Sequence, residues 1–228
     1  MQFLKSVDAL IGDLRKFEIA NISADFPLVK LDFAFNFVKH CIELDLEVHY
    51  LDFDLILSSL MQNVSYSDYR NLSRGLQIFQ PGENSVESSV TSLLGSLAKK
   101  EGFIIIDSFN MMQNLIALES SPHDSLVANR KSSVLISLIQ QVARNRLNTL
   151  VVLSLAKSRP KRMEGDTVVW EKELVGGRML KLKSDETLLL KLVKEGKDHQ
   201  ESKQEVREIL ASPLDGVSEP YRILSQKW

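Results

Sequence analysis

Blocks of apolar and polar residues predict strands and helices in turn along the chain. The clearest blocks are two continuous apolar runs, GFIIIDS at 102–108 and NTLVVLSLA at 148–156. A run that is apolar at almost every position is typical of a strand buried on both faces of a parallel sheet. Shorter strands are predicted at 17–22, 47–54 and 76–82.

Helical spacing of apolar residues fills most of the stretches between these strands. The predicted helices lie at 3–14, at 28–44, in part of 55–74, at 83–100 and within 125–147. Strands that alternate with helices favour an α/β protein, with a mostly parallel central sheet flanked by helices and right-handed crossovers.

The pattern of apolar and polar residues changes after Ala156. Residues 157–177 are polar and begin with a basic cluster, so we expect a loop there. The segments 187–196 and 205–213 are separated by a polar turn, and a short strand at 220–224 follows them, which predicts late antiparallel strands. We find no linker rich in Gly, Pro or Ser. The expected organisation is therefore an N-terminal amphipathic helix (1–16) and one core domain (17–228).

The amino-acid composition and net charge exclude several classes of protein. The 228 residues carry a net charge of −2, so no global basic field draws the chain to nucleic acid. A single cysteine excludes a disulfide framework, and four scattered histidines predict no metal site. No apolar run approaches the roughly 20 residues of a membrane span, and the N-terminus lacks the apolar centre of a signal peptide. We expect a cytoplasmic protein.

Four segments, in this order along the chain, resemble parts of the RecA/RadA/KaiC core of the P-loop ATPases. They are a strand, loop and helix in FEIANISADFPLVKL (17–31), a strand with an acidic ending in VHYLDFD (48–54), a Walker B-like strand in FIIIDS (103–108), and a paired glycine before a late strand in ELVGGRMLKLKSDETLLLKLVKEG (173–196). The resemblance covers roughly residues 17–224 and implies a RecA-like fold.

The phosphate-binding loop departs from the family pattern. A Walker A motif reads G-x-x-x-x-G-K-[ST], and residues 24–31 read ADFPLVKL, in which Lys30 alone matches. Leu31 has no oxygen for Mg²⁺, Pro27 has no N–H to offer a phosphate, and Asp25 adds a negative charge. We therefore expect ATPase activity to be absent or very weak, with ATP and Mg²⁺ as cofactors only if some activity survives.

Three residues occupy positions where the resemblance implies a role in nucleotide binding or hydrolysis. Lys30 would be a vestigial phosphate ligand, and its alternative is a solvated lysine in the first turns of a helix, which we favour. Asp107 would hold a Mg²⁺-bound water, or else cap the turn that follows its strand. Asp54 falls where active relatives place the glutamate that orients the attacking water, and neighbouring Asp52 is expected to face solvent. We predict none of them to be catalytic.

A basic cluster, Lys157, Arg159, Lys161 and Arg162, follows the second apolar strand. In RecA-type recombinases the loops after this strand contact DNA, so the resemblance implies a phosphate-contacting patch. The alternative is a solvated loop, because four acidic residues lie just beyond it.

These observations lead to one hypothesis and two alternatives. The first is a non-catalytic RecA-fold protein that works by homo- or hetero-oligomeric assembly and binds nucleic acid or a partner ATPase, in DNA recombination or repair. One alternative is a ring scaffold that contacts RNA, as the RecA-fold accessory subunits of Elongator do. The other is an atypical ATPase or a nucleotide sensor.

Overall fold

A computed structural model describes most of the chain. The described residues are 5–81, 85–97, 100–119, 125–162, 168–173, 177–197, 205–214 and 218–226.

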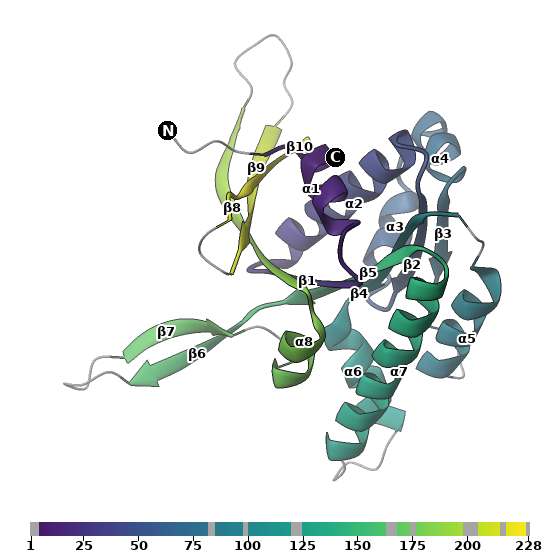
Figure 1. The fold of residues 1–228 in the computed structure, drawn as a ribbon. Helices are drawn as coiled ribbons and strands as arrows, with labels where there is room; N and C mark the ends of the chain where they lie inside the picture. Colours follow the sequence, from purple (N-terminus) through teal and green to yellow (C-terminus); the bar gives the residue numbers. More distant parts are fainter. Residues whose placement is uncertain are drawn as a thin grey trace.

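Eight strands of the described chain form one sheet, in the order β10-β9-β8-β1-β5-β4-β2-β3 (Figure 1). The five strands β1, β5, β4, β2 and β3 are parallel to their neighbours, β8 is parallel to β1, and β9 and β10 are antiparallel. The strands are β1 Ile19–Ala24, β2 Glu47–Asp52, β3 Leu76–Phe79, β4 Gly102–Asp107, β5 Asn148–Leu155, β8 Glu186–Lys197, β9 Glu205–Pro213 and β10 Tyr221–Gln226. The predicted fold class, a mostly parallel α/β sheet with late antiparallel strands, is confirmed.

Helices cover both faces of this sheet. They are α1 Val7–Leu14, α2 Pro27–Glu43, α3 Ile56–Met61, α4 Tyr66–Leu72, α5 Val86–Ser96, α6 Phe109–Glu119, α7 Ser125–Asn145 and α8 Gly177–Lys183. Residues of α1 to α4 pack into the core on one face, and residues of α5 to α8 into the core on the other. Strand β4 shows why its sequence is apolar throughout: Phe103 and Ile105 belong to the first core, and Ile104 and Ile106 to the second.

Four elements differ from the predictions. Helices α6 and α8 lie where no element was predicted. Residues 157–162, predicted as a loop, form strand β6 (Lys157–Arg162), which pairs in an antiparallel ribbon with β7 (Val168–Glu173). This ribbon is a sheet of its own and projects from the body of the molecule (Figure 1). The glycine pair at 176–177 lies partly outside the described residues, and Gly177 begins α8.

Helix α2 is held on the sheet by apolar packing and by a buried ion pair. Its apolar face carries Phe33, Phe37 and Cys41, which are all buried in the core as their spacing of four predicted. On the same helix, buried Asp32 accepts a bond of 2.7 Å from the Arg207 guanidinium of β9. An ion pair out of water is costly to break, so it ties α2 to the late strands.

The parallel arrangement gathers the carboxyl ends of β1, β2, β4 and β5 at one edge of the sheet. The β1–α2 junction follows one of these ends, and Asp54 and Asp107 follow or close two others. Ligands of open α/β sheets bind outside this edge, so the predicted site residues are brought to one place.

Gly102 is a position where a side chain has no room. It opposes Glu47 in the β2–β4 register, and a Cβ there would overlap the Glu47 carbonyl. We predict that Gly102→Ala lowers the free energy of unfolding by about 3 kcal/mol or more, because backbone has to move. Gly95→Ala is the matched control, since no atom lies within 4 Å of the added carbon, and it should raise stability by about 0.5 kcal/mol. Urea unfolding checks both, and equal effects would contradict the packing described.

Asp13 joins α1 to β10 and should make stability depend on pH. Its carboxylate accepts bonds from Lys16 at 2.5 Å, from Tyr221 at 3.0 Å and from Lys5 at 3.2 Å. The Lys16 bond, with those of Tyr221 and Lys5, lowers the pKa of Asp13 from 3.8 to about 2 despite partial burial. A lowered acid pKa gives stability that is complete above pH 4 and is lost as the pH falls through 2.

We therefore expect Asp13→Asn to cost about 1–2 kcal/mol at pH 6 and progressively less as the pH approaches 2. The check is the difference in urea unfolding between wild type and variant across this range. Asp45→Asn, at a carboxylate that is almost fully exposed, should show a small and nearly constant difference. A pH-independent difference for Asp13→Asn would contradict the assignment.

Candidate functional site

Lys30 lies in the first turn of α2. The helix begins at Pro27 after an extended residue, Phe26, and no side chain caps it. A proline suits this position because its fixed φ matches the helix and its missing N–H is not needed there. The side chain of Lys30 is only 1% exposed, so the solvated lysine that we favoured from sequence is wrong.

The Lys30 ammonium is bound by two carboxylates that come from distant parts of the chain. Its Nζ donates to Oδ2 of Asp54 at 2.5 Å and to Oδ1 of Asp107. Asp107 is the last residue of β4, and Asp54 follows β2 by two residues. The structure therefore places the three residues that the resemblance singled out in one cluster, with the two carboxylates on either side of the ammonium.

Both carboxylates have further donors on their second oxygen. The Tyr50 hydroxyl of β2 donates to Oδ2 of Asp107. The backbone N–H and the hydroxyl of Ser108 donate to Oδ1 of Asp54, at 3.0 and 2.6 Å. The peptide bond between Asp107 and Ser108 is cis. We call Lys30, Tyr50, Asp54, Asp107 and Ser108 the lysine cluster.

Asp52 lies beside this cluster and is fully buried, so the prediction that it faces solvent is wrong. It opposes Asp107 in the β2–β4 register. Its Oδ2 accepts from the backbone N–H of Ser58 at 2.7 Å and from the Ser58 hydroxyl at 2.5 Å, which secures the start of α3. Two carboxylates thus bind the Lys30 ammonium, and a third, Asp52, lies opposite one of them on the neighbouring strand.

Charge and burial act against each other in the cluster. Burial by itself would lower the pKa of Lys30, but the carboxylates of Asp107 and Asp54 outweigh it and hold this pKa above 10.5. Burial raises the pKa of Asp107 above 3.8, although Lys30 and Tyr50 oppose the shift. Burial and the charge of Asp107 raise the pKa of Tyr50 well above 10, so its phenol stays protonated and donates.

The residues at this edge do not fit a bound Mg-triphosphate. The ammonium that would reach phosphate oxygens is occupied by Asp54 and Asp107, and Leu31 offers Mg²⁺ no oxygen. The N–H of Asp25 donates to Leu190 of β8 at 3.3 Å, so it does not point at a ligand. Phe26 and Leu28 extend into solvent, each 58% exposed. The described arrangement is a closed internal ion cluster.

The basic cluster lies apart from these residues, on the β6–β7 ribbon. Lys157, Arg159, Lys161 and Arg162 are all on β6, in a strand where a loop was predicted. The backbone register sets Lys157 opposite Glu173 and Arg159 opposite Glu171.

Two members of the lysine cluster were not singled out from sequence. Tyr50 lies between His49 and Leu51 in strand β2, and a tyrosine buried in a strand needs a partner for its hydroxyl, which is a usable signal. Ser108 directly follows Asp107 and carries no such signal, because its donors are aimed by the chain turn after β4.

Comparison with known proteins assigns no family to the chain. No protein-family model matches the sequence, and no curated protein matches it. Within the described ranges, no group of three or more His, Cys, Asp or Glu side chains is placed to hold a metal ion. None of the helices described here combines the length and hydropathy of a bilayer span.

Replacing Lys30 should affect stability as a buried charge does. We predict that Lys30→Met lowers the free energy of unfolding at pH 7 by about 3–5 kcal/mol, because Asp54 and Asp107 lose their counter-charge. The loss should shrink toward pH 4, because burial raises the pKa of Asp107 and its orphaned carboxylate takes up a proton there. Urea unfolding at both pH values measures it.

Lys39→Met, on the exposed side of the same helix, is the control and should change stability by less than about 0.5 kcal/mol. If both variants unfolded alike at pH 7, the lysine cluster would not be the structural ion centre described here.

Proposed function

We propose that this chain is a non-catalytic protein of RecA-like fold that acts by assembly with other subunits. The observation that carries the proposal is the state of Lys30. In a working P-loop the lysine reaches the phosphates, and here its ammonium is buried against Asp54 and Asp107. An ammonium held in two internal ion pairs is not available to the phosphates of a nucleotide.

The surface beside the lysine cluster supports an assembly role. Apolar side chains next to the cluster in sequence extend into solvent: Phe26 and Leu28 at the start of α2, Leu55 after β2, and Met111 on α6. Leu55 is 44% exposed and has a φ of 59°, a conformation costly for a branched side chain. In the family that the chain resembles, subunits meet across the nucleotide site. An apolar surface in that place suits a permanent protein contact.

The proposal extends to nucleic acid through the β6–β7 ribbon. Its four cations would contact phosphates, and the ribbon projects from the body, where it can reach a partner (Figure 1). With a partner ATPase or DNA, the role would be in recombination or repair. A ring scaffold that contacts RNA would use the same two surfaces.

One observation favours the alternative of an atypical ATPase or a nucleotide sensor. Lys30, Asp54 and Asp107 are far apart in sequence and still converge at the carboxyl edge of the sheet. An active site would need these three positions in this place. For it to work, Lys30 would have to leave its carboxylates, and a partner would have to supply the Mg²⁺ ligand that Leu31 lacks.

We expect the purified chain to assemble and to ignore ATP. Light scattering after size exclusion should give a mass above that of a monomer, and calorimetric titration with up to about 1 mM Mg-ATP should give no binding heat. Phe26→Asp with Leu28→Asp should shift the mass to the monomer while circular dichroism stays unchanged. Leu147→Asp is the control, since Leu147 is exposed at the opposite edge of the sheet, with a φ of 60° that Asp tolerates.

A strict monomer at high concentration would refute the assembly role for this chain alone. Measurable ATP hydrolysis that is lost in both Lys30→Ala and Asp107→Ala would replace it with the enzyme alternative. Nucleotide binding without hydrolysis would favour the sensor.

A further inference from the structure

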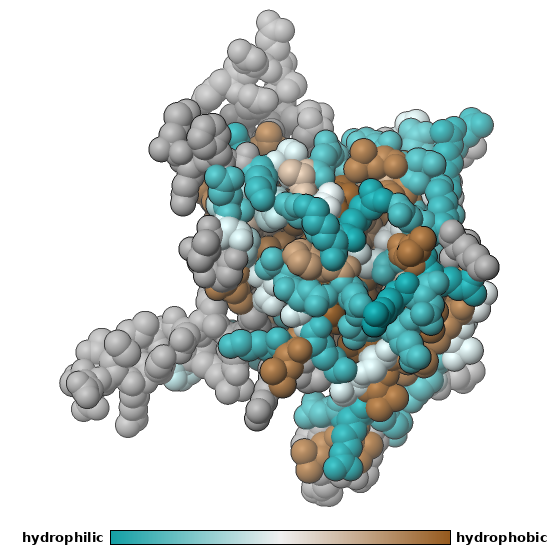
Figure 2. All heavy atoms as spheres, viewed as in Figure 1, coloured by the Kyte–Doolittle hydropathy of each residue, from teal (hydrophilic) through white to brown (hydrophobic). Residues whose placement is uncertain are grey.

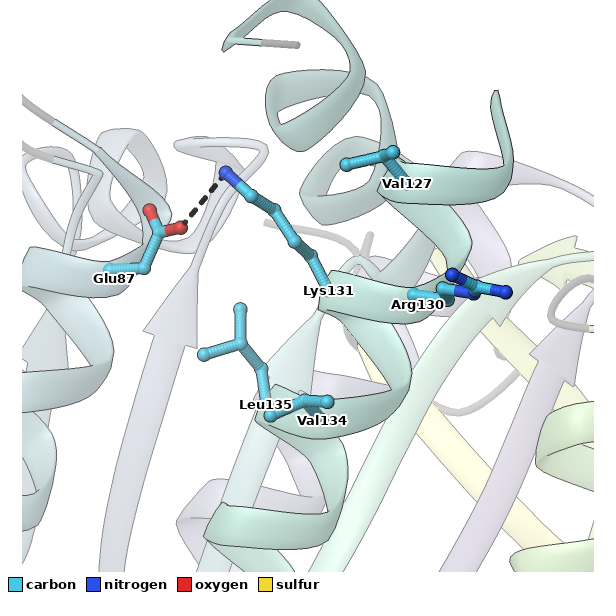
Figure 3. Close-up of a pocket in the computed structure, with 6 residues that line it drawn as sticks. All are labelled: Glu87, Val127, Arg130, Lys131, Val134 and Leu135. Atoms are coloured by element: carbon cyan, nitrogen blue, oxygen red, sulfur yellow. Dashed lines mark hydrogen bonds and ion pairs between the residues drawn. The ribbon is translucent and has the colours of Figure 1, made fainter. Parts of the chain in front are cut away.

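A pocket of about 340 Å³ lies between α5 and α7, on the sheet face opposite α2. Its lining comes from one residue of α5 and five of α7: Glu87, Val127, Arg130, Lys131, Val134 and Leu135 (Figure 3). The pocket is far in sequence from the lysine cluster, and none of the lining residues belongs to that cluster.

The outer side of α7 carries a stripe through this pocket that is apolar except at Lys131. Val127, Lys131, Val134 and Leu138 follow one another at spacings of four, three and four. Val134 is 65% exposed and Leu138 is 41% exposed. Such spacing places residues on one face of a helix, in the pattern that receives another helix. Figure 2 shows apolar residues breaking the polar surface where Figure 1 places α7.

The facing side of α5 lets a second helix approach closely. Thr91 and Gly95 lie four and eight residues after Glu87, on the same side of α5, and both are exposed. Neither has a bulky side chain, and no atom lies within 4 Å of the place where a Cβ of Gly95 would stand. Glu87 is the α5 residue in the pocket lining, and we call the pocket with the exposed sides of α5 and α7 beside it the α5–α7 groove.

The pocket lining carries one net positive charge, since Arg130 and Lys131 of α7 stand against Glu87 of α5. The 21 residues of α7 contain no Asp or Glu, and its third cation, Arg144, lies outside the lining and pairs with Glu18 at 3.1 Å. Lys131 is matched by Glu87, at 3.4 Å. Arg130 is turned away from Glu87 (Figure 3), and it makes no ion pair within the described part of the chain. A ligand in the groove would meet one uncompensated guanidinium beside apolar side chains.

We propose that the α5–α7 groove binds an acidic amphipathic helix of a partner protein. Apolar residues of that helix, spaced three and four apart, would fill the pocket between Val127 and Val134, and an Asp or Glu would pair with Arg130. A second copy of α7 is a poorer occupant, because two helices without acidic residues would bring Arg130 and Lys131 against like charges. This surface is separate from the assembly surface beside the lysine cluster.

The test uses the full chain and two synthetic peptides of about 20 residues, long enough to form a helix. Both carry Leu at positions spaced three and four apart, one with Glu and the other with Lys at the polar positions. Fluorescence anisotropy of labelled peptide measures binding. We expect the Glu peptide to bind at least tenfold more tightly than the Lys peptide, with the preference weaker at high salt.

Variants locate the site. Val134→Asp should weaken binding of the Glu peptide at least tenfold, and Arg130→Glu should remove or reverse the preference for it. Leu182→Asp replaces a leucine that is equally exposed, on α8, and should leave binding unchanged. Circular dichroism confirms that each variant is folded.

Several results would overturn the proposal: no binding of the Glu peptide at millimolar concentration, equal binding of both peptides, or binding that survives Val134→Asp. Self-association that Val134→Asp abolishes would assign the groove to a second copy of the chain.

Discussion

The structure depends on one buried ammonium group. Lys30 links the first turn of α2 to the ends of β2 and β4 through Asp54 and Asp107, so three elements that begin far apart in sequence meet at one charge. Removing these groups from water costs several kcal/mol for each ion, and their mutual attraction and the donors from Tyr50 and Ser108 offset that cost. The cluster therefore specifies how α2 sits on the sheet more than it adds net stability.

The same cluster turns the Lys30 cation at the start of α2 inward, because its ammonium is bound by Asp54 and Asp107. Phe26 and Leu28, on either side of Pro27, project into solvent from the start of the same helix. This edge of the sheet therefore presents apolar side chains, while the charges of Lys30, Asp54 and Asp107 are paired with one another.

Much of the fold could be predicted because burial leaves a direct mark on sequence. The apolar runs at 102–107 and 148–155 are the central strands, and the helix at 27–43 begins one residue from its predicted start. The β6–β7 ribbon escaped prediction because the residues of β6 are mostly polar and show no apolar alternation, and the ribbon pairs in a sheet of its own.

The position of the candidate site could be predicted from the sequence, but the burial and ion pairing of Lys30 could not. The order of elements pointed to Lys30, Asp54 and Asp107, since parallel strands end at one edge. Nothing along the chain indicated that the lysine bends inward, because its partners lie 24 and 77 residues away and the choice depends on three-dimensional packing. A lysine in a first helical turn is ordinarily solvated, and that general expectation failed here.

The ion pair between Asp32 and Arg207 bears on what counts as the smallest folding unit. Asp32 sits two residues from Lys30 on the same helix, and its counter-ion arrives from β9, near the end of the chain. Truncating the protein before residue 207 would leave the buried Asp32 carboxylate without its counter-ion, in the helix turn next to Lys30. The late antiparallel strands are thus a structural part of the core and cannot be treated as a detachable appendage.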